Sequence, residues 1–260
     1  MSDDVNIVHE FDTDHGHYQV IDMAYDGRPA RVLFSGQQQA AQSGLASDGH
    51  PDLLFDYNQR LFELASGLEP SRLLMIGGGM FTLPMALLEA LPNVQIDAVE
   101  IDAGLPAVAA KFFGLQTNPR LTIYIDDGLR YLASSTQQYD LIIIDAFTHD
   151  IAASDLGDQV STRHLKKLLN DGGSLAYNNI AAYYGRRSQD LRQLQSNLED
   201  QLGRVTIYPA TNGQSLWLSQ NLIVVAQTDT KYPIDQYLRH QPLDSQASPF
   251  NFSRDLRQLQ

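Results

Sequence analysis

The segment Leu74-Met75-Ile76-Gly77-Gly78-Gly79 joins a short apolar run to three consecutive glycines, and it decides the fold of this chain. An apolar run of this length predicts a buried β-strand. Glycines directly after a strand permit a tight turn into a helix and let the backbone come close to a ligand. We therefore expect a strand–turn–helix unit that opens an α/β nucleotide-binding domain.

Strand and helix patterns alternate downstream of these glycines. Strands are predicted at 94–99, 121–125, 141–144 and 174–177, and helices at 80–90, 105–113, 128–134, 161–169 and 189–202. The run Leu141–Ile144 has no polar residue on either face, which is typical of a central parallel strand. Two last strands, at 205–208 and 215–226, flank the turn signal Asn212-Gly213. This order predicts a doubly wound, mostly parallel sheet that ends in an antiparallel hairpin.

The first fifty residues have a different pattern. The pattern predicts two strands, at 18–25 and 31–34, that form a hairpin. It predicts a loop at 43–51 and an amphipathic helix at 52–66. We expect three parts: a small β-rich domain at 1–50, the nucleotide-binding domain at 51–230 and a peripheral polar tail at 231–260.

Acidic residues follow each of the next strands. The second strand ends in Glu100-Ile101-Asp102, the third in Asp126-Asp127-Gly128 and the fourth in Asp145. Ligands of such sheets bind at the carboxyl ends of the strands. An acid about twenty residues after the glycines suits ribose hydroxyls, and one on the next strand can accept from a purine amine. Each acid alone could be a helix cap, but four sites in order predict a nucleotide site.

Composition excludes several classes of function. The formal charge is −13 and the basic residues are scattered, which argues against nucleic acid as a partner. The chain has no cysteine, so disulfides and thiolate metal sites are excluded. No segment has the apolar length of a membrane span, and no signal peptide is recognisable, so the cytoplasm is the default location. Asp12, Asp14, His15 and His17 favour a solvated turn over a metal site, and we predict no metal.

The order of motifs from residue 18 to 226 resembles the spermidine synthase family, a branch of the class I S-adenosylmethionine-dependent methyltransferase fold. The resemblance implies that Gly77, Gly78 and Gly79 form the glycine motif and that Glu100 and Ile101 lie in the ribose-binding segment. It also implies that Asp126, Asp127 and Gly128 hold the adenine, that Gln39 contacts the nucleoside, and that Asp145 opens the catalytic loop. The cofactor implied is S-adenosylmethionine or its decarboxylated form, and a homo-oligomer is implied as well.

Two departures from the family pattern bear on the reaction. The family continues its glycine motif with Asp-Gly-Gly, whereas this chain has Met80-Phe81-Thr82. The family's catalytic loop has a second Asp where this chain has Thr148, and Asp150 lies two residues later. Aminopropyl transfer brings two amines into one pocket, and their charge needs buried carboxylates.

We therefore expect methyl transfer to a small-molecule acceptor, with Asp145, His149 and Asp150 as catalytic candidates. The first alternative is aminopropyl transfer in which Asp150, Asp155 or Asp158 replaces the missing acid. The second alternative is a catalytically silent protein that binds a nucleoside or a partner.

Overall fold

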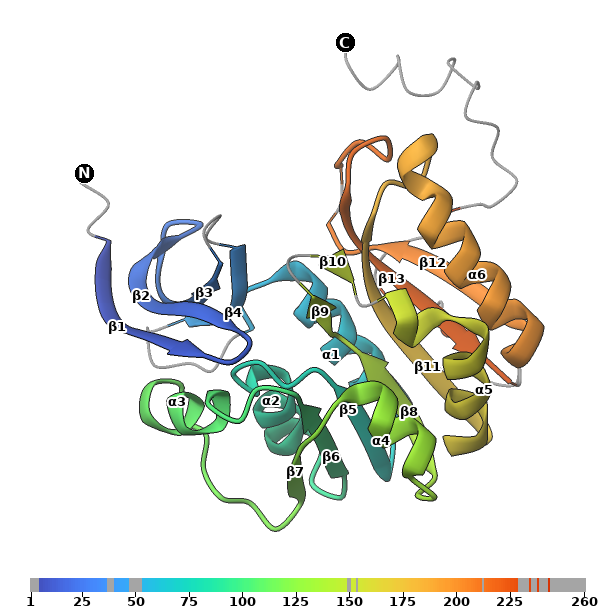
Figure 1. Ribbon diagram of the computed structural model, residues 1–260, viewed down its shortest axis with the longest axis horizontal. Helices are drawn as coiled ribbons and strands as arrows, with labels where there is room; N and C mark the ends of the chain where they lie inside the picture. Colours follow the sequence, from blue (N-terminus) through green and yellow to red (C-terminus); the bar gives the residue numbers. More distant parts are fainter. Residues whose placement is uncertain are drawn as a thin grey trace.

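The computed structural model describes residues 5–36, 40–46, 53–148, 151–152, 154–211 and 213–228, together with 234, 238 and 243. It contains two large sheets (Figure 1). The first is antiparallel, with its strands in chain order: β1 (Asn6–Thr13), β2 (Gly16–Tyr25), β3 (Arg28–Ser35) and β4 (Ala40–Ala46). This confirms an N-terminal β-rich unit and adds one strand before, and one after, the predicted hairpin.

The second sheet has seven strands in the order β12-β13-β11-β8-β5-β6-β7. They are β5 (Arg72–Ile76), β6 (Gln95–Glu100), β7 (Leu121–Ile125), β8 (Tyr139–Ile144), β11 (Leu169–Ala181), β12 (Arg204–Pro209) and β13 (Gln220–Gln227). The five from β7 to β11 are parallel, and β13 runs antiparallel to both β11 and β12. The predicted doubly wound sheet with a terminal antiparallel hairpin is confirmed.

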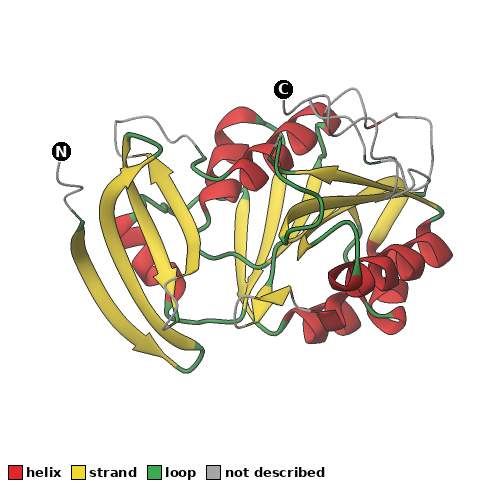
Figure 2. Ribbon diagram, turned by 90° about the horizontal axis from the view of Figure 1, so that it is seen from above, coloured by secondary structure: helices red, strands yellow, loops and turns green. Residues whose placement is uncertain are grey.

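Helices cover both faces of this sheet (Figure 2). They are α1 (Asp56–Leu68), α2 (Thr82–Ala90), α3 (Leu105–Phe112), α4 (Gly128–Ser134), α5 (Gln159–Leu168) and α6 (Gln189–Leu202), with short turns η1 (Ser154–Gly157) and η2 (Arg186–Ser188). On the central strand β8, Leu141 and Ile143 pack with α1 and α2, whereas Ile142 and Ile144 pack with α5 and α6. Alternation between two apolar layers explains why this strand carries no polar residue.

A third apolar cluster joins the two sheets. Tyr18, Val20 and Leu33 of the antiparallel sheet pack with Met80, Phe81 and Ala98 and with α3 residues such as Val108. All of these side chains are at most 9% exposed. The antiparallel sheet is therefore packed onto the glycine turn and α3, so the position of one constrains the other.

Four local predictions differ from the structure. The first residues of the predicted loop at 43–51 belong to β4. Gly44 in this strand makes room for the Leu54 side chain, which would lie 2.6 Å from a Cβ added at Gly44. The strand predicted at 174–177 begins earlier, at Leu169, and includes a bulge, because its pairing with β8 shifts between Leu169 and Ser174. The last strand begins at Gln220, later than predicted. In the predicted tail, Ile234 and Leu238 are buried in the core, so these positions are not peripheral.

Candidate active site

The glycine turn lies against the end of β8. Gly77 has φ +93° and Gly79 has φ +51°, a region that glycine occupies without steric cost. A Cβ added at Gly77 would lie 2.1 Å from the carbonyl oxygen of Asp145. Only a residue without a side chain fits there, so the turn brings its backbone directly beside the first candidate catalytic residue.

The Glu100 carboxylate holds this turn in place. It is 6% exposed, and its Oε2 accepts hydrogen bonds from the backbone amides of Gly78 and Gly79 at 2.8 and 2.9 Å. Its Oε1 accepts from the amide of Asp102 at 2.9 Å. A carboxylate offers about four acceptor positions, so about one is left for a ribose hydroxyl. The role of Glu100 in ribose binding stays a prediction, and its structural role is now defined.

We expect Glu100→Gln to lower the free energy of unfolding by about 1–3 kcal/mol, because one oxygen that faces backbone amides becomes an NH₂ group. Chemical denaturation measures this loss. Glu89→Gln, on the exposed surface of α2, is the matched control and should change little. Equal stability of the two variants would contradict the holding role.

The acids after β7 already have partners. Asp127 caps α4, since its carboxylate accepts a hydrogen bond from the Arg130 amide. Asp126 accepts from the Asp127 amide at 2.8 Å and from Arg130 Nε at 2.6 Å. Gly128 packs so tightly that an added Cβ would lie 2.6 Å from Ile76. These contacts stabilise the start of α4, and the role of Asp126, Asp127 and Gly128 in holding an adenine stays a prediction.

A cavity of about 470 Å³ brings residues of two predicted ligand segments together with His15 of the first hairpin. Its lining is formed by His15, Ile101, Ile125, Asp126, Asp127 and Arg130. Ile101, which follows β6, and Ile125, which ends the edge strand β7, are 47% and 48% exposed, so both present apolar surface at this cavity. Gly77, Gly78, Gly79, Glu100 and Asp145 are not part of this lining.

Asp145 follows β8 and is partly buried. Burial raises the pKa of its carboxyl from 3.8 to about 6, although a hydrogen bond from Asn178 opposes the rise. Asn178 Nδ2 donates to Asp145 Oδ1 at 2.8 Å. The nearby Asp145 carboxylate also adds to burial in raising the pKa of Tyr57. Asp145 is therefore a carboxylate with an elevated proton affinity, placed between α1 and β11.

Two buried asparagines were not among the predicted site residues: Asn178, which bonds Asp145, and Asn58, which follows Tyr57 in α1. Asn178 is fully buried and Asn58 is 3% exposed. The side-chain oxygen of each accepts no hydrogen bond within the described part of the chain. Part of the signal for Asn178 was present in the sequence. Tyr177 pairs with Ile144, so the next residues, Asn178 and Asp145, lie side by side. The strand predicted at 174–177 ended one residue before Asn178.

Met80 does not face a ligand pocket through its side chain. It is fully buried between the two sheets, and its amide donates to Ser43 Oγ at 3.2 Å. Phe81 precedes α2 with φ +57°, where the resembling family has glycine. Substitution of Asp-Gly by Met80-Phe81 has thus turned this part of the turn into core. At position 80 the departure from the family pattern therefore amounts to the absence of an acid.

Three of the predicted site residues, Gln39, His149 and Asp150, lie outside the described residues. The two-residue strands β9 (Phe147–Thr148) and β10 (Ile151–Ala152) pair on either side of the latter two. Among the residues that the structure describes, no group of three or more His, Asp or Glu could hold a metal ion. None of the helices in this part of the chain is long and apolar enough to cross a membrane.

Residues 55–209, more than half of the chain, match the spermine/spermidine synthase domain. The chain belongs to this family. The match covers α1, the glycine turn, every acidic strand end and the strands from β5 to β12. The family resemblance inferred from the motif order is confirmed.

Individual members of the spermine/spermidine synthase family and its neighbours differ in their reactions. A polyamine aminopropyltransferase of Vibrio vulnificus is 30% identical over 116 residues, which cover 44% of this chain and 39% of that protein. An eEF1A lysine and N-terminal methyltransferase of Mus musculus is 32% identical over 136 residues, which cover 51% of this chain and 17% of that protein. The chain thus spans well under two thirds of either relative.

Solved structures show the same fold. A probable spermidine synthase from Corynebacterium glutamicum superposes with a TM-score of 0.74 at 18% identity, covering 92% of this chain and 91% of that one. Human methyltransferase-like protein 13 in complex with SAH superposes with a TM-score of 0.57 at 22% identity, covering 76% and 97%. At these identities the likeness establishes the class I methyltransferase-like fold.

Proposed function

We propose that this family member binds S-adenosylmethionine at the carboxyl edge of its large sheet and transfers the methyl group to a small acceptor, with Asp145 as the base. One observation carries the proposal. Of the strand-end acids that the structure describes, Asp145 alone combines a pKa raised to about 6 with a single hydrogen-bond donor, Asn178. The other strand-end acids already accept hydrogen bonds from backbone amides or from Arg130.

Methyl transfer needs the acceptor, the methyl carbon and the sulfur in line, and at most one proton to be removed. Bound S-adenosylmethionine supplies a methyl group activated by a sulfonium. A base with a pKa near 6 is largely ionised at neutral pH and still accepts a proton more readily than an ordinary aspartate. Asn178, whose Nδ2 donates to Asp145 Oδ1 at 2.8 Å, holds the carboxylate of the proposed base in place.

The residues present fit the nucleotide. Three of the roughly four acceptor positions of the Glu100 carboxylate are taken by backbone amides, so about one remains for a ribose hydroxyl. Ile101 and Ile125 offer apolar surface to a flat base in the cavity that they line. Asp126 and Asp127 on the same cavity would face its exocyclic amine.

Aminopropyl transfer is the second candidate, because family membership and the Vibrio relative's name favour it. It requires a second free acid for the additional cationic amine. Thr148 replaces the expected one, and Asp158 caps α5 by accepting from the amides of Val160 and Ser161. The described acids therefore support methyl transfer better.

Titration calorimetry with S-adenosylmethionine, and separately with its decarboxylated form, tests the choice. We expect the intact cofactor to bind at least about tenfold more tightly, because no acid at position 80 repels its carboxylate. Incubation with radiolabelled cofactor and a panel of small amines, alcohols and carboxylates then tests turnover. Preference for the decarboxylated form with turnover of putrescine would establish the second candidate, and binding without any turnover would indicate a silent nucleoside-binding protein.

A further inference from the structure

The turn between β1 and β2 is fixed to the segment that follows β6. The Asp102 carboxylate is 2% exposed, and it accepts a hydrogen bond from Thr13 Oγ1 at 2.5 Å and from the Gly104 amide at 2.9 Å. The methyl group of Thr13 lies 2.9 Å from where a Cβ of Gly104 would be. A buried carboxylate with two donors and this close packing hold the tip of the hairpin against the large sheet.

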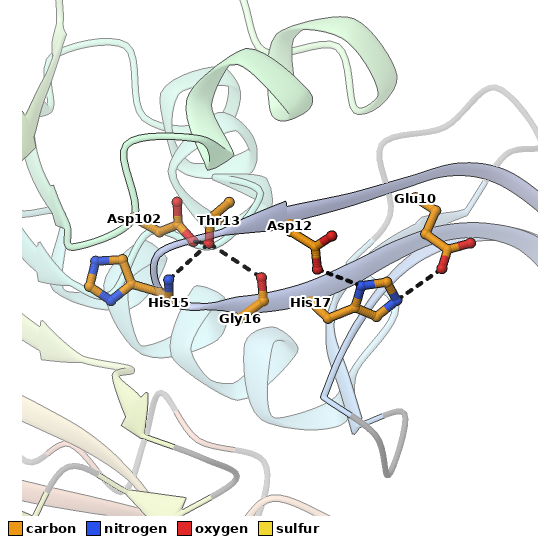
Figure 3. Close-up of polar contacts among 7 residues, drawn as sticks. All are labelled: Glu10, Asp12, Thr13, His15, Gly16, His17 and Asp102. Carbon is orange, nitrogen blue, oxygen red and sulfur yellow. Dashed lines mark hydrogen bonds and ion pairs between the residues drawn. The ribbon is translucent and has the colours of Figure 1, made fainter.

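The same threonine positions His15. Thr13 Oγ1 accepts a hydrogen bond from the His15 amide at 3.1 Å. Figure 3 shows His15 at the tip of the hairpin beside Thr13 and Asp102, with its ring extending away from the strands. Its imidazole forms no hydrogen bond or ion pair with another described residue, and it lines the cavity that Ile101 and Ile125 share. Within the described part of the chain, a polar ring without a hydrogen-bond partner therefore lies at the edge of an apolar floor.

The other polar side chains of this cavity are already engaged. Asp126 and Arg130 bond each other, and Asp127 caps α4. Imidazole can stack on a purine, and its ring nitrogens can donate to and accept from the base edge. The apolar floor formed by Ile101 and Ile125, together with the His15 ring, suits a flat heteroaromatic group better than a flexible chain.

We infer that His15, supplied by the N-terminal sheet, contacts the base of the bound nucleoside, and that Thr13 and Asp102 position it. This inference rests on the proposed function. It adds a contact from outside the family-matched residues 55–209.

His17 provides a matched control on the same hairpin. Its Nδ1 lies 2.9 Å from Asp12 and its Nε2 lies 3.0 Å from Glu10. Figure 3 shows it farther along the hairpin, between these two carboxylates, and it is not part of the cavity lining. If removal of any histidine from this hairpin weakened binding, His15→Ala and His17→Ala would both bind more weakly. If His15 contacts the base, only His15→Ala would.

The test is calorimetric titration of the full chain with S-adenosylhomocysteine. We expect His15→Ala to bind about tenfold more weakly than the unaltered protein, which is the size of a lost base–ring contact. His17→Ala should bind as the unaltered protein does. Because His15 is exposed, the substitution should leave the unfolding transition unchanged.

The positioning role has its own readout. Thr13→Val removes the hydroxyl that links Asp102 to His15 and should weaken binding, whereas Thr13→Ser keeps the hydroxyl and should restore it. The double variant Thr13→Val, His15→Ala should lose no more binding affinity than His15→Ala alone, because Thr13 acts through His15. Unchanged affinity of His15→Ala, with normal binding by the unaltered protein, would overturn the inference alone. Absence of binding by the unaltered protein would overturn the proposed function and this inference together.

Discussion

Gly77→Ala is expected to lower the free energy of unfolding by more than about 3 kcal/mol and to abolish nucleotide binding. The φ of +93° adds roughly 1–2 kcal/mol for any residue with a Cβ. The added Cβ would also lie 2.1 Å from the Asp145 carbonyl oxygen, which belongs to backbone and cannot rotate away. Relief requires the turn or the end of β8 to shift, and both carry candidate site residues.

Gly114→Ala separates these two effects. Gly114 has φ +78°, but nothing lies within 4 Å of its added Cβ. Denaturant unfolding of both variants should therefore show a loss of about 1–2 kcal/mol for Gly114→Ala and clearly more for Gly77→Ala. Equal losses would mean that the turn moves freely and that its close approach to Asp145 has no importance.

Asp145→Asn is expected to lower the turnover rate by about 10²–10⁴ and to make the protein more stable at pH 8. The folded-state pKa of about 6 exceeds the ordinary 3.8, so the fold favours the protonated acid. Its contribution to stability is present below pH 3.8 and is lost as the pH rises through 6. Above that pH the ionised group destabilises the fold by up to about 3 kcal/mol, which asparagine avoids while keeping the Asn178 contact.

Urea unfolding at pH 4.5 and pH 8 measures the second effect. The stability gain of Asp145→Asn should grow between these two values. Asp171→Asn, on the exposed bulge of β11, is the control and should show no such growth. A gain that is the same at both pH values would show that Asp145 titrates normally, and would remove it as the base of the proposed reaction.

The layered sheet could be predicted because its signals are local. Apolar strand runs, the glycine turn and acids at successive strand ends are each set by a few neighbouring residues. What those acids contact was less predictable. Glu100 bonds amides more than twenty residues earlier, and Asp102 bonds Thr13 across 89 residues. Only the folded chain brings such partners together.

Small residues misled the prediction where tertiary packing overrode local preference. Ser43 and Gly44 favour a loop, yet they lie in β4, where Gly44 makes room for Leu54 and Ser43 bonds the Met80 amide. Asn178 carries no local signal of function, since an isolated asparagine in a strand is uninformative. Its importance follows from parallel pairing with β8, which depends on register.

The link from Thr13 through Asp102 to Glu100 has an architectural consequence. The Glu100 carboxylate ties the glycine turn to the amide of Asp102, and the Asp102 side chain ties that loop to the first hairpin. Deletion of the first four strands would leave a buried carboxylate without its hydroxyl partner and would open an apolar cluster around Met80 and Val108 to water. The N-terminal sheet is therefore no removable module: the seven-stranded sheet and its helices are left incomplete without it.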